Sequence, residues 1–380
     1  MENLLTENQI DIRDLVRDYA IKELRPTAEE RDKTAVFPSD VWADLVDMGL
    51  TGIGVAEEYG GAGMGQLEKI VAVEELAKVD GAVGGIYSIS SILQHALQKF
   101  GTDAQKDKYL ENITSGGKLG AFALTEAGAG SDAGATKTTA VFDESTNEYV
   151  LNGSKTFITS GKAAEYVLVF ALTDPAAKAR GLSAIIVEKG TPGFTYGKVE
   201  DKMGIRASET VELVFQDCRV PKENLLGEEN KGLSIALSLI DTARIGVSAQ
   251  AVGIAQGALD LSIKYAKERE QFGRPIADLQ GIQWYLATME TKIQAARALT
   301  TIAAQLADKG IRHSKEAAMA KLFASQTARE VTNLALQIHG GYGYMKDFPL
   351  ERMYRDAKIT EIYEGTSEVQ KLVIARSILK

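Results

Sequence analysis

The segment of residues 355–370 contains the side chain best suited to chemistry, Glu364. The residues before it repeat with a helical period, Gly365 then breaks the helix, and Ser367 can cap the next one. A carboxylate at such a break can point into a cavity and act there as a general base. A glutamate beside a helix end is also typical of a surface or capping group, so other parts of the chain have to decide between the two.

Residues 124–133 form a second candidate site, a loop in which two glycines and an alanine match the pattern G-x-G-x-x-A. A dinucleotide fingerprint of this kind opens a helix within a βαβ unit. Here a threonine-rich stretch leads from the loop into strands, which argues against a Rossmann fold. The hydroxyls of Thr125 and Ser131 could still bind a polar ligand, and a simple glycine turn is the alternative.

Three further segments have compositions that suit a flat, anionic cofactor. Phe157 and Thr159 share one side of an extended segment and could flank an aromatic ring, although ordinary barrels contain such pairs too. Arg269 and Arg274 follow a helix and could bind phosphate, or could simply be exposed. The glycines of residues 337–343 permit close approach of a ligand, and a C-cap would explain only one or two of them.

Composition and motifs exclude several other classes. The formal charge of −9 argues against a broad surface for nucleic acid or anionic membranes. The three histidines, His95, His313 and His339, are too scattered for a metal motif, and no G-x-S-x-G or P-loop is present. Cys218, the single cysteine, excludes internal disulfides and is expected in the core. Without a signal peptide or a stretch apolar enough to span a bilayer, we expect a cytoplasmic protein.

The periodicity of apolar residues predicts an α+β chain in three parts. The first part reads as helices: one opens at Thr6 and is ended by Pro26, one is capped by Ser39, and one covers residues 67–78. Short β-rich runs follow and predict a small barrel or sandwich, at residues 121–124, 139–142, 149–151, 166–170, 185–187 and 211–215.

Long helical runs after residue 221 predict a bundle, at residues 232–269, 278–309, 314–339 and 350–363. We therefore expect an N-terminal helical domain over residues 1–118, a β-barrel domain over residues 119–226 and a C-terminal four-helix bundle over residues 227–380.

Seven segments in this order resemble the acyl-CoA dehydrogenase family of flavoenzymes, most closely its bacterial short-chain (butyryl-CoA type) members. They are residues 57–61, 124–132, 156–159, 202–206, 269–275, 339–343 and 362–368, and the resemblance covers essentially the whole chain. It implies the three domains described above, assembled as a homotetramer with FAD between barrel and bundle.

The resemblance also implies roles for individual residues. FAD would be bound by residues that include some from a neighbouring subunit: Phe122, Leu124, Thr125, Gly130, Ser131, Phe157, Thr159, Arg269, Phe272, Gln280, Gln337, Gly340, Gly341, Thr366 and Glu368. The acyl-CoA would contact Ser131, Asp241, Arg244, Tyr363 and Gly365. No metal is implied.

Glu364 falls at the family's catalytic base, which removes the α-proton of the thioester while the β-hydride passes to flavin N5, forming a trans-2-enoyl-CoA. The base's own N–H and a flavin hydroxyl would bind the thioester oxygen. Ala243 occupies the position of the base in isovaleryl and some long-chain members, which leaves Glu364 as the sole candidate. Residues 83–87 offer no charge to a distal carboxylate and favour a neutral acyl chain. Ala127 and Ser160 replace a frequent proline and asparagine, changes that concern loop geometry.

We therefore expect an FAD-dependent short-chain acyl-CoA dehydrogenase that passes electrons to an electron-transferring flavoprotein. A second hypothesis keeps the fold and reverses the direction: a 2-enoyl-CoA reductase that works with a bifurcating electron-transferring flavoprotein. A third, from another class, is an acyl-CoA-binding protein without turnover.

Overall fold

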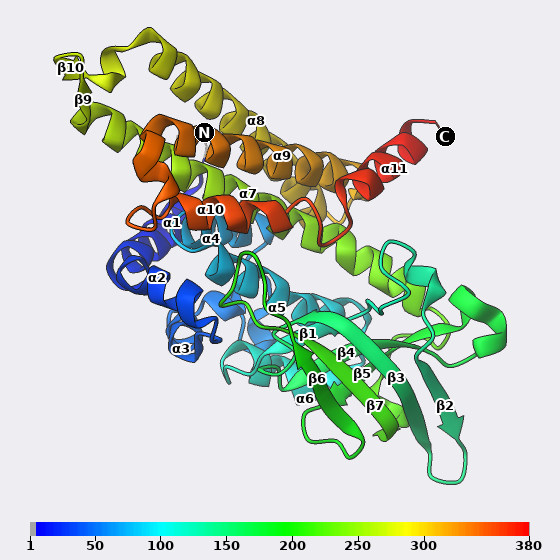
Figure 1. The fold of residues 1–380 in the computed structure, drawn as a ribbon. Helices are drawn as coiled ribbons and strands as arrows, with labels where there is room; N and C mark the ends of the chain where they lie inside the picture. Colours follow the sequence, from blue (N-terminus) through cyan, green and yellow to red (C-terminus); the bar gives the residue numbers. More distant parts are fainter. Residues whose placement is uncertain (1–4, 380) are drawn as a thin grey trace.

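The N-terminal part of the chain is helical, as the sequence predicts (Figure 1). The structure is a computed structural model that describes residues 5–379. The helices of this part are α1 (Glu7–Tyr19), α2 (Arg25–Thr34), α3 (Ser39–Asp47), α4 (Gln66–Ala77), α5 (Gly81–Phe100) and α6 (Asp103–Thr114). The predicted capping box opens α1: the Thr6 hydroxyl accepts the Gln9 N–H, and the Gln9 side chain accepts the Thr6 N–H.

The prediction that Pro26 ends the first helix is wrong. A π-helical turn over Ala20–Leu24 follows α1, and Pro26 lies in the first turn of α2. The wider turn shifts the hydrogen bonds, so that the Arg25 N–H donates to the carbonyl of Ala20. A proline fits the position that follows because its nitrogen has no hydrogen to satisfy.

Two polar residues near helix ends also act differently from expectation. Ser39 is the first residue of α3 and makes no capping bond. Asp80, which the sequence suggests as a stop after residue 78, is the N-cap of α5, where its Oδ1 accepts the N–H groups of Ala82 and Val83. The periodicity of apolar residues does not predict α5, because the helix is buried on most sides and begins with a glycine-rich segment of low helix propensity.

The middle part forms the predicted β domain. Its strands are β1 (Gly120–Ala123), β2 (Thr139–Asp143), β3 (Glu148–Thr159), β4 (Tyr166–Leu172), β5 (Leu182–Glu188), β6 (Phe194–Val199), β7 (Thr210–Pro221) and β8 (Leu225–Leu226). They make one mixed sheet in the order β6-β7-β3-β2-β4-β5-β8, and β1 pairs in parallel with β4. Cys218 is buried in β7, as expected for a core residue.

The C-terminal part is a helical bundle. It consists of α7 (Gly232–Glu268), α8 (Gln280–Asp308), α9 (Ser314–His339), α10 (Leu350–Ile359) and α11 (Ser367–Ile378), with a short hairpin, β9 (Glu270–Gln271) and β10 (Arg274–Pro275), between α7 and α8. The proposed domain limits after residues 118 and 226 fall between α6 and β1 and between β8 and α7.

Helix α7 corrects the expectation that no stretch is apolar enough to span a membrane. Its length and a mean hydropathy of 1.3 meet that criterion. However, 67% of this apolar window is buried inside the protein, where α7 packs against α4, α5, α8 and α9. Its apolar side chains thus have protein neighbours, as in the central helix of a bundle.

A polar contact joins all three parts of the chain beside α10. Arg355 of α10 donates to both carboxylate oxygens of Asp32 in α2, at 3.1 and 2.6 Å, and to the carbonyl of Met203 at 2.9 Å. Arg206 donates to the carbonyl of Asp32 at 2.9 Å. Helix α10, which leads into the segment that contains Glu364, is therefore anchored to both other parts.

Candidate active site

The candidate base lies in a strained turn between α10 and α11. Glu364 has φ +53° and Gly365 has φ +91°, so two successive residues are left-handed. For a glutamate this conformation costs about 1–3 kcal/mol, and surrounding contacts have to hold it. Thr366 is the N-cap of α11, and its hydroxyl accepts the Val369 N–H at 3.4 Å. The expected cap, Ser367, is instead the first residue of that helix.

Buried side chains from three helices hold the two carbonyl groups of this turn. Arg244 of α7 donates from Nε to the Glu364 carbonyl at 3.3 Å, and Lys321 of α9 donates from Nζ to the Gly365 carbonyl at 2.7 Å. Gln370 of α11 donates from Nε2 to both carbonyls, at 3.2 and 2.7 Å. The backbone of the turn is thus fixed from inside the protein.

The reactive groups of Glu364 are left open. Within residues 5–379, neither its carboxylate nor its backbone N–H has a hydrogen-bond partner. The side chain is partly buried, and removal from water raises the pKa of its carboxyl, an effect that the charges of Arg244 and Lys321 oppose. A carboxylate that can accept a proton therefore shares one residue with a free N–H donor.

An apolar cluster connects this turn to the β domain. Tyr363 packs against a cluster that includes Leu124 after β1 and Ala243 of α7, and Phe122 packs against the same cluster. Residues of β1 and its following loop and a residue of the turn after α10 thus contact the same apolar cluster. Ala243 is buried there and has no polar side-chain group, so this position of α7 offers no carboxylate beside the turn.

A buried polar contact closes the space between α5 and α7 beside the turn. The Tyr363 hydroxyl donates to Oε1 of Gln250, and Nε2 of Gln250 donates to the Gly81 carbonyl at 2.7 Å. A Cβ at Gly85 would lie 2.7 Å from Gln250 Nε2 and 3.8 Å from the Tyr363 hydroxyl oxygen. A side chain at position 85 would therefore have to displace the Gln250 amide from its hydrogen bonds.

The predicted substrate residues Asp241 and Arg244 lie on α7 next to the turn. Nη1 of Arg244 donates to Oδ1 of Asp241 at 2.7 Å, and the Ser314 hydroxyl donates to Oδ2 of Asp241. Thr366 follows the turn as a helix cap, whereas Glu368 is exposed on the first turn of α11.

The glycine loop after β1 is held by a buried ion pair. Nζ of Lys155 lies 2.7 Å from Oε1 of Glu126 and donates to the Leu124 carbonyl at 3.1 Å. The Thr156 N–H donates to the carbonyl of Thr125 at 2.8 Å, which ties the loop to β3. Gly130 and Ser131, further along the loop, are exposed.

Phe157 and Thr159 lie at an irregular place in β3. The register with β7 shifts between Lys155 and Ile158, and Phe157 has φ +59°. A bulge of this kind re-aims a side chain, and the Phe157 ring is 61% exposed. Ser160 has φ +55° and a buried hydroxyl without a partner among the described residues, at a position where asparagine would be better tolerated.

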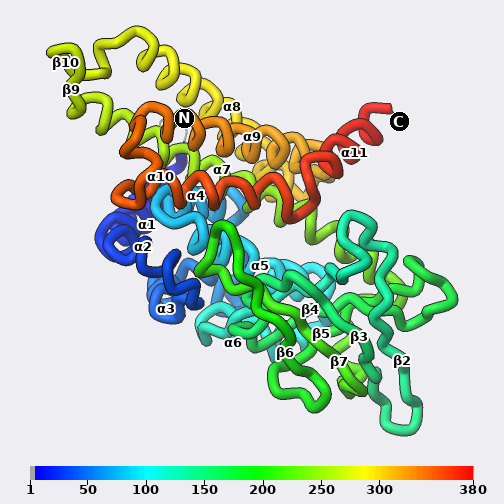
Figure 2. The backbone as a smooth tube through the Cα atoms, in the orientation of Figure 1, coloured from blue at the N-terminus to red at the C-terminus, as the bar shows by residue number. Residues whose placement is uncertain are grey.

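The other predicted cofactor residues lie at the opposite end of the molecule. Arg269, Phe272 and Gln280 belong to the β9–β10 hairpin and the start of α8, and Gln337, Gly340 and Gly341 to the end of α9. All six are exposed. In Figure 2 this hairpin and the β domain lie on opposite sides of the molecule. One copy of the chain does not bring the two groups together.

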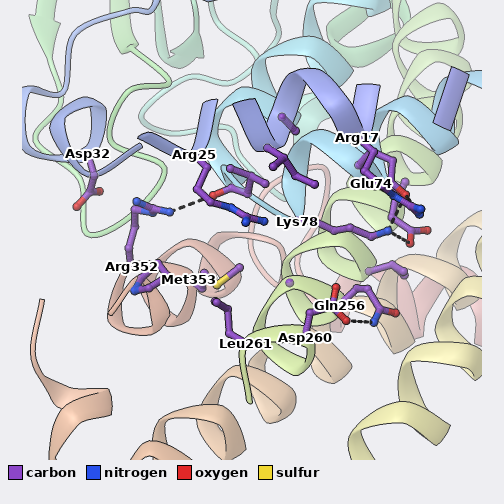
Figure 3. A pocket seen from close by; sticks show the side chains of 18 of the residues that line it. Arg17, Arg25, Asp32, Glu74, Lys78, Gln256, Asp260, Leu261, Arg352 and Met353 are labelled. Atoms are coloured by element: carbon purple, nitrogen blue, oxygen red, sulfur yellow. Dashed lines mark hydrogen bonds and ion pairs between the residues drawn. The ribbon is translucent and has the colours of Figure 1, made fainter. Parts of the chain in front are cut away.

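A cavity of about 1590 Å³ lies elsewhere, between the N-terminal helices and the bundle. Figure 3 shows Arg17, Glu74 and Lys78 at one side of it and Gln256 and Asp260 at another. Charged side chains that line it have polar partners in its wall. Nζ of Lys78 lies 2.6 Å from Oε1 of Glu75, and Nε2 of Gln256 donates to Oδ1 of Asp260 at 2.8 Å. None of the predicted site residues lines this cavity.

Sequence reasoning missed the buried polar residues that support the site, Lys155, Gln250, Lys321 and Gln370. A signal for Lys321 was present, because it interrupts a helical stripe of alanines, Ala317, Ala324 and Ala328, all of which are buried. A lone lysine on such a face requires a polar partner inside the protein. No group of metal-binding side chains occurs among residues 5–379.

Comparisons with known proteins cover the whole chain. Residues 6–117, 121–218 and 230–379 match the models of the acyl-CoA dehydrogenase N-terminal, middle and C-terminal domains. An acryloyl-CoA reductase (NADH) from Anaerotignum propionicum is 61% identical over 100% of this chain and 96% of its own length.

Two solved structures are similar throughout. The butyryl-CoA dehydrogenase from Megasphaera elsdenii aligns with a TM-score of 0.97 and 48% identity over 99% of both chains. A chain in a structure described as the electron transferring flavoprotein of Acidaminococcus fermentans, concerned with flavin-based electron bifurcation, aligns with a TM-score of 0.98 and 51% identity over 100% of both chains.

Proposed function

This chain belongs to the acyl-CoA dehydrogenase family of flavin-dependent oxidoreductases, and we propose that it interconverts a short-chain acyl-CoA and the trans-2-enoyl-CoA. The observation that carries this proposal is the Glu364 turn, in which the main chain is fixed by buried donors while the carboxylate and the N–H stay open.

The residues of the turn suit removal of a proton next to a thioester. The carboxylate of Glu364 accepts the α-proton, and its raised pKa makes it a stronger base than an ordinary glutamate. The N–H of the same residue donates to the thioester oxygen, where negative charge develops. The positive charges of Arg244 and Lys321 oppose this rise in the pKa of Glu364. In the reverse direction the same carboxyl returns the proton.

The residues expected to bind FAD have the chemistry that this cofactor needs. Phe157 and Phe272 are 61% and 89% exposed, and large exposed rings of this kind gain from an apolar partner. A Cβ at Gly340 or Gly341 would meet nothing within 4 Å, so the backbone there is open to a ligand. Nearby Arg269 offers a guanidinium to a diphosphate. When bound, FAD supplies the acceptor for the β-hydride.

The position of these residues supports a homo-oligomer. Because Phe157 lies in the β domain and Phe272 at the far end of the bundle, one FAD that touches both would need two copies of the chain. We propose the homotetramer of the family, with the residues of the β9–β10 hairpin completing the cofactor site of a neighbouring copy. The cytoplasm is the compartment that we propose for it.

The closed packing beside Glu364 supports a short acyl group. Gln250 and Tyr363 fill the space against α5, and Gln250 is fully buried. Val83 and its neighbours on α5 are buried and uncharged, so a distal carboxylate would lack a partner. A short neutral chain such as propionyl or butyryl fits these walls best.

A second candidate is the same chemistry run as reduction of a 2-enoyl-CoA. It is favoured by the 61% identity to an acryloyl-CoA reductase (NADH) and by the similarity to a chain in a structure of an electron transferring flavoprotein. In either direction we propose an electron-transferring flavoprotein as the redox partner. Retention of an open base in a fixed turn argues against a protein that binds acyl-CoA without turnover.

The test is an anaerobic titration of the purified protein with acyl-CoAs, followed by the flavin absorbance. We expect a yellow protein that is bleached by propionyl- or butyryl-CoA and much more slowly by octanoyl- or glutaryl-CoA. A colourless protein, or one that no acyl-CoA bleaches, contradicts the proposal.

The direction is tested with the electron-transferring flavoprotein from the same source. Oxidation of NADH that depends on acryloyl- or crotonyl-CoA in the mixture supports the reductase. Its absence, together with electron flow from butyryl-CoA to the partner, supports the dehydrogenase.

A further inference from the structure

Lys321 is a buried cation that the packing of α9 does not require. Its side chain is 0% exposed and lies among buried alanines of the same helix. Within residues 5–379 no carboxylate lies within 4.0 Å of its Nζ, so the ammonium has no ion-pair partner of ordinary length. A buried charge without such a partner costs stability that a methionine of similar shape would not cost.

Among residues 5–379, the side chain of Lys321 makes one hydrogen bond, which is directed at the candidate active site. Its Nζ donates to the carbonyl of Gly365 at 2.7 Å, one residue after the base. That carbonyl belongs to Gly365, which directly follows Glu364, the non-glycine residue whose left-handed conformation strains the main chain. Gln370 supports the same carbonyl but is neutral, and Arg244 supports the preceding one.

We propose that Lys321 is a positioning residue for Glu364: its buried ammonium holds the Gly365 carbonyl, and with it the direction of the Glu364 carboxylate and N–H. This inference rests on the proposed function, since it assigns Glu364 as the base. Lys321 itself contacts neither substrate nor cofactor in this assignment.

The charge of Lys321 adds a second effect. The groups that face its ammonium are Arg244 from α7, Glu361 and Glu364 from the turn, and Glu368 from α11. Burial lowers the pKa of Lys321 to about 7, with Glu364 acting in the opposite direction, and Lys321 in turn lowers the pKa of Glu364. Removal of this positive charge would raise the pKa of Glu364, so the base would be protonated over a wider acidic range.

The experiment compares the parent with Lys321→Met, which keeps the apolar stem and removes the charge and the donor. The matched control is Lys358→Met, because Lys358 is an exposed lysine that pairs with Glu361 of the same turn at 2.6 Å. Anaerobic stopped-flow bleaching by saturating butyryl-CoA is recorded from pH 6 to pH 9. FAD content, the Kd for acyl-CoA and the melting temperature are measured in parallel.

For Lys321→Met we expect flavin reduction at pH 7 to slow by about tenfold or more, and the acid limb of the profile to move up by about one pH unit. FAD content and the Kd for acyl-CoA should stay within about threefold of the parent, since the lysine touches neither ligand. Amide hydrogen exchange of residues 360–371 should become faster, as a readout independent of turnover. Lys358→Met should reproduce the parent profile.

A rate within twofold of the parent with an unmoved acid limb would overturn the proposal. The proposal would also be overturned by a variant with a lower FAD content and a lower melting temperature if the molecules that still hold FAD keep the acid limb of the parent. Lys321→Gln, which keeps a neutral donor for the Gly365 carbonyl, is the second variant. If neither variant folds, Lys321 is a residue of the fold, and the positioning role is refuted. If no acyl-CoA bleaches the flavin of the parent, the proposed function is contradicted, and this outcome is distinct from a failure of the positioning role of Lys321.

Discussion

Asp356 and Glu364 are two carboxyl groups eight residues apart that are both withdrawn from water. They differ in whether their carboxylate oxygens accept hydrogen bonds from the protein. Asp356 on α10 is 2% exposed, and its Oδ1 accepts the N–H of Ile205. Burial raises the pKa of Asp356 to about 7, although this hydrogen bond lowers it. Burial also raises the pKa of Glu364, whose carboxylate has no hydrogen-bond partner within the described chain.

The difference lies in which part of each residue is held. At Asp356 the side chain is held by a hydrogen bond, which stabilises Ile205, a β-branched residue at φ +42°. At Glu364 the main chain is committed, through bonds from Arg244 and Gln370 to its carbonyl, and the side chain is not. A raised pKa by itself therefore does not identify a base. A raised pKa on an open side chain with a fixed backbone makes Glu364 the candidate.

The largest expected effect separates the two groups by activity. Glu364→Gln keeps the size of the side chain and removes its basicity, so flavin reduction by butyryl-CoA should slow by about 10²–10⁴-fold while FAD and acyl-CoA still bind. Stopped-flow bleaching under anaerobic conditions measures the rate. Asp356→Asn serves as the control and should stay within about threefold of the parent. A reduction rate within tenfold of the parent in Glu364→Gln would remove Glu364 from the role of base.

The pH dependence of the rate sharpens the same contrast. Since the carboxylate of Glu364 is the active form and its pKa is raised, reduction should slow by about tenfold for each pH unit below that pKa and level off above it. Asp356→Asn should show the same acid limb. An acid limb that disappears in Asp356→Asn would mean that Asp356, and not Glu364, controls the profile.

Stability should respond in the reverse order. Asp356→Ala leaves the N–H of Ile205 buried without an acceptor, which costs about 1–3 kcal/mol. Thermal or urea unfolding of the FAD-loaded protein at pH 5.5, where Asp356 is largely protonated, measures the loss. Glu364→Gln should unfold like the parent, because the hydrogen bonds of that turn use main-chain atoms. Equal losses in the two variants would end the distinction between them.

The smallest effect is a change in the pH dependence of stability. The pKa of Asp356 is raised in the folded protein, so the folded state holds its proton more tightly than the unfolded state, and stability falls as the pH rises from about 4 to about 7. Asp356→Asn keeps an acceptor for Ile205 and does not titrate. Its melting temperature relative to the parent should therefore rise between pH 6 and pH 7, by the equivalent of about 1 kcal/mol. A constant difference across this range would argue against a raised pKa.

The family, the fold class and the enzyme class predicted from the sequence are confirmed. The family and the enzyme class are predicted from a resemblance carried by seven segments in order, among them residues 124–132 and 362–368, and the fold class from the periodicity of apolar residues. The roles of individual residues stay predictions, and the experiments above test the central ones. Pro26, Ser39 and Ser367 show where local rules mislead, since each stands one or two residues from the place that its propensity suggests.

The sequence by itself determined that Glu364 stands before a helix-breaking glycine and that position 243 carries an alanine and no carboxylate. Only the tertiary structure decided how the turn is held, because Arg244, Lys321 and Gln370 converge on it from three helices. Their separation along the chain leaves no periodic signal, and a buried polar side chain acquires its meaning only from the partner it meets. A carboxylate can be recognised in a sequence, but its pKa and its direction depend on groups that folding brings to it.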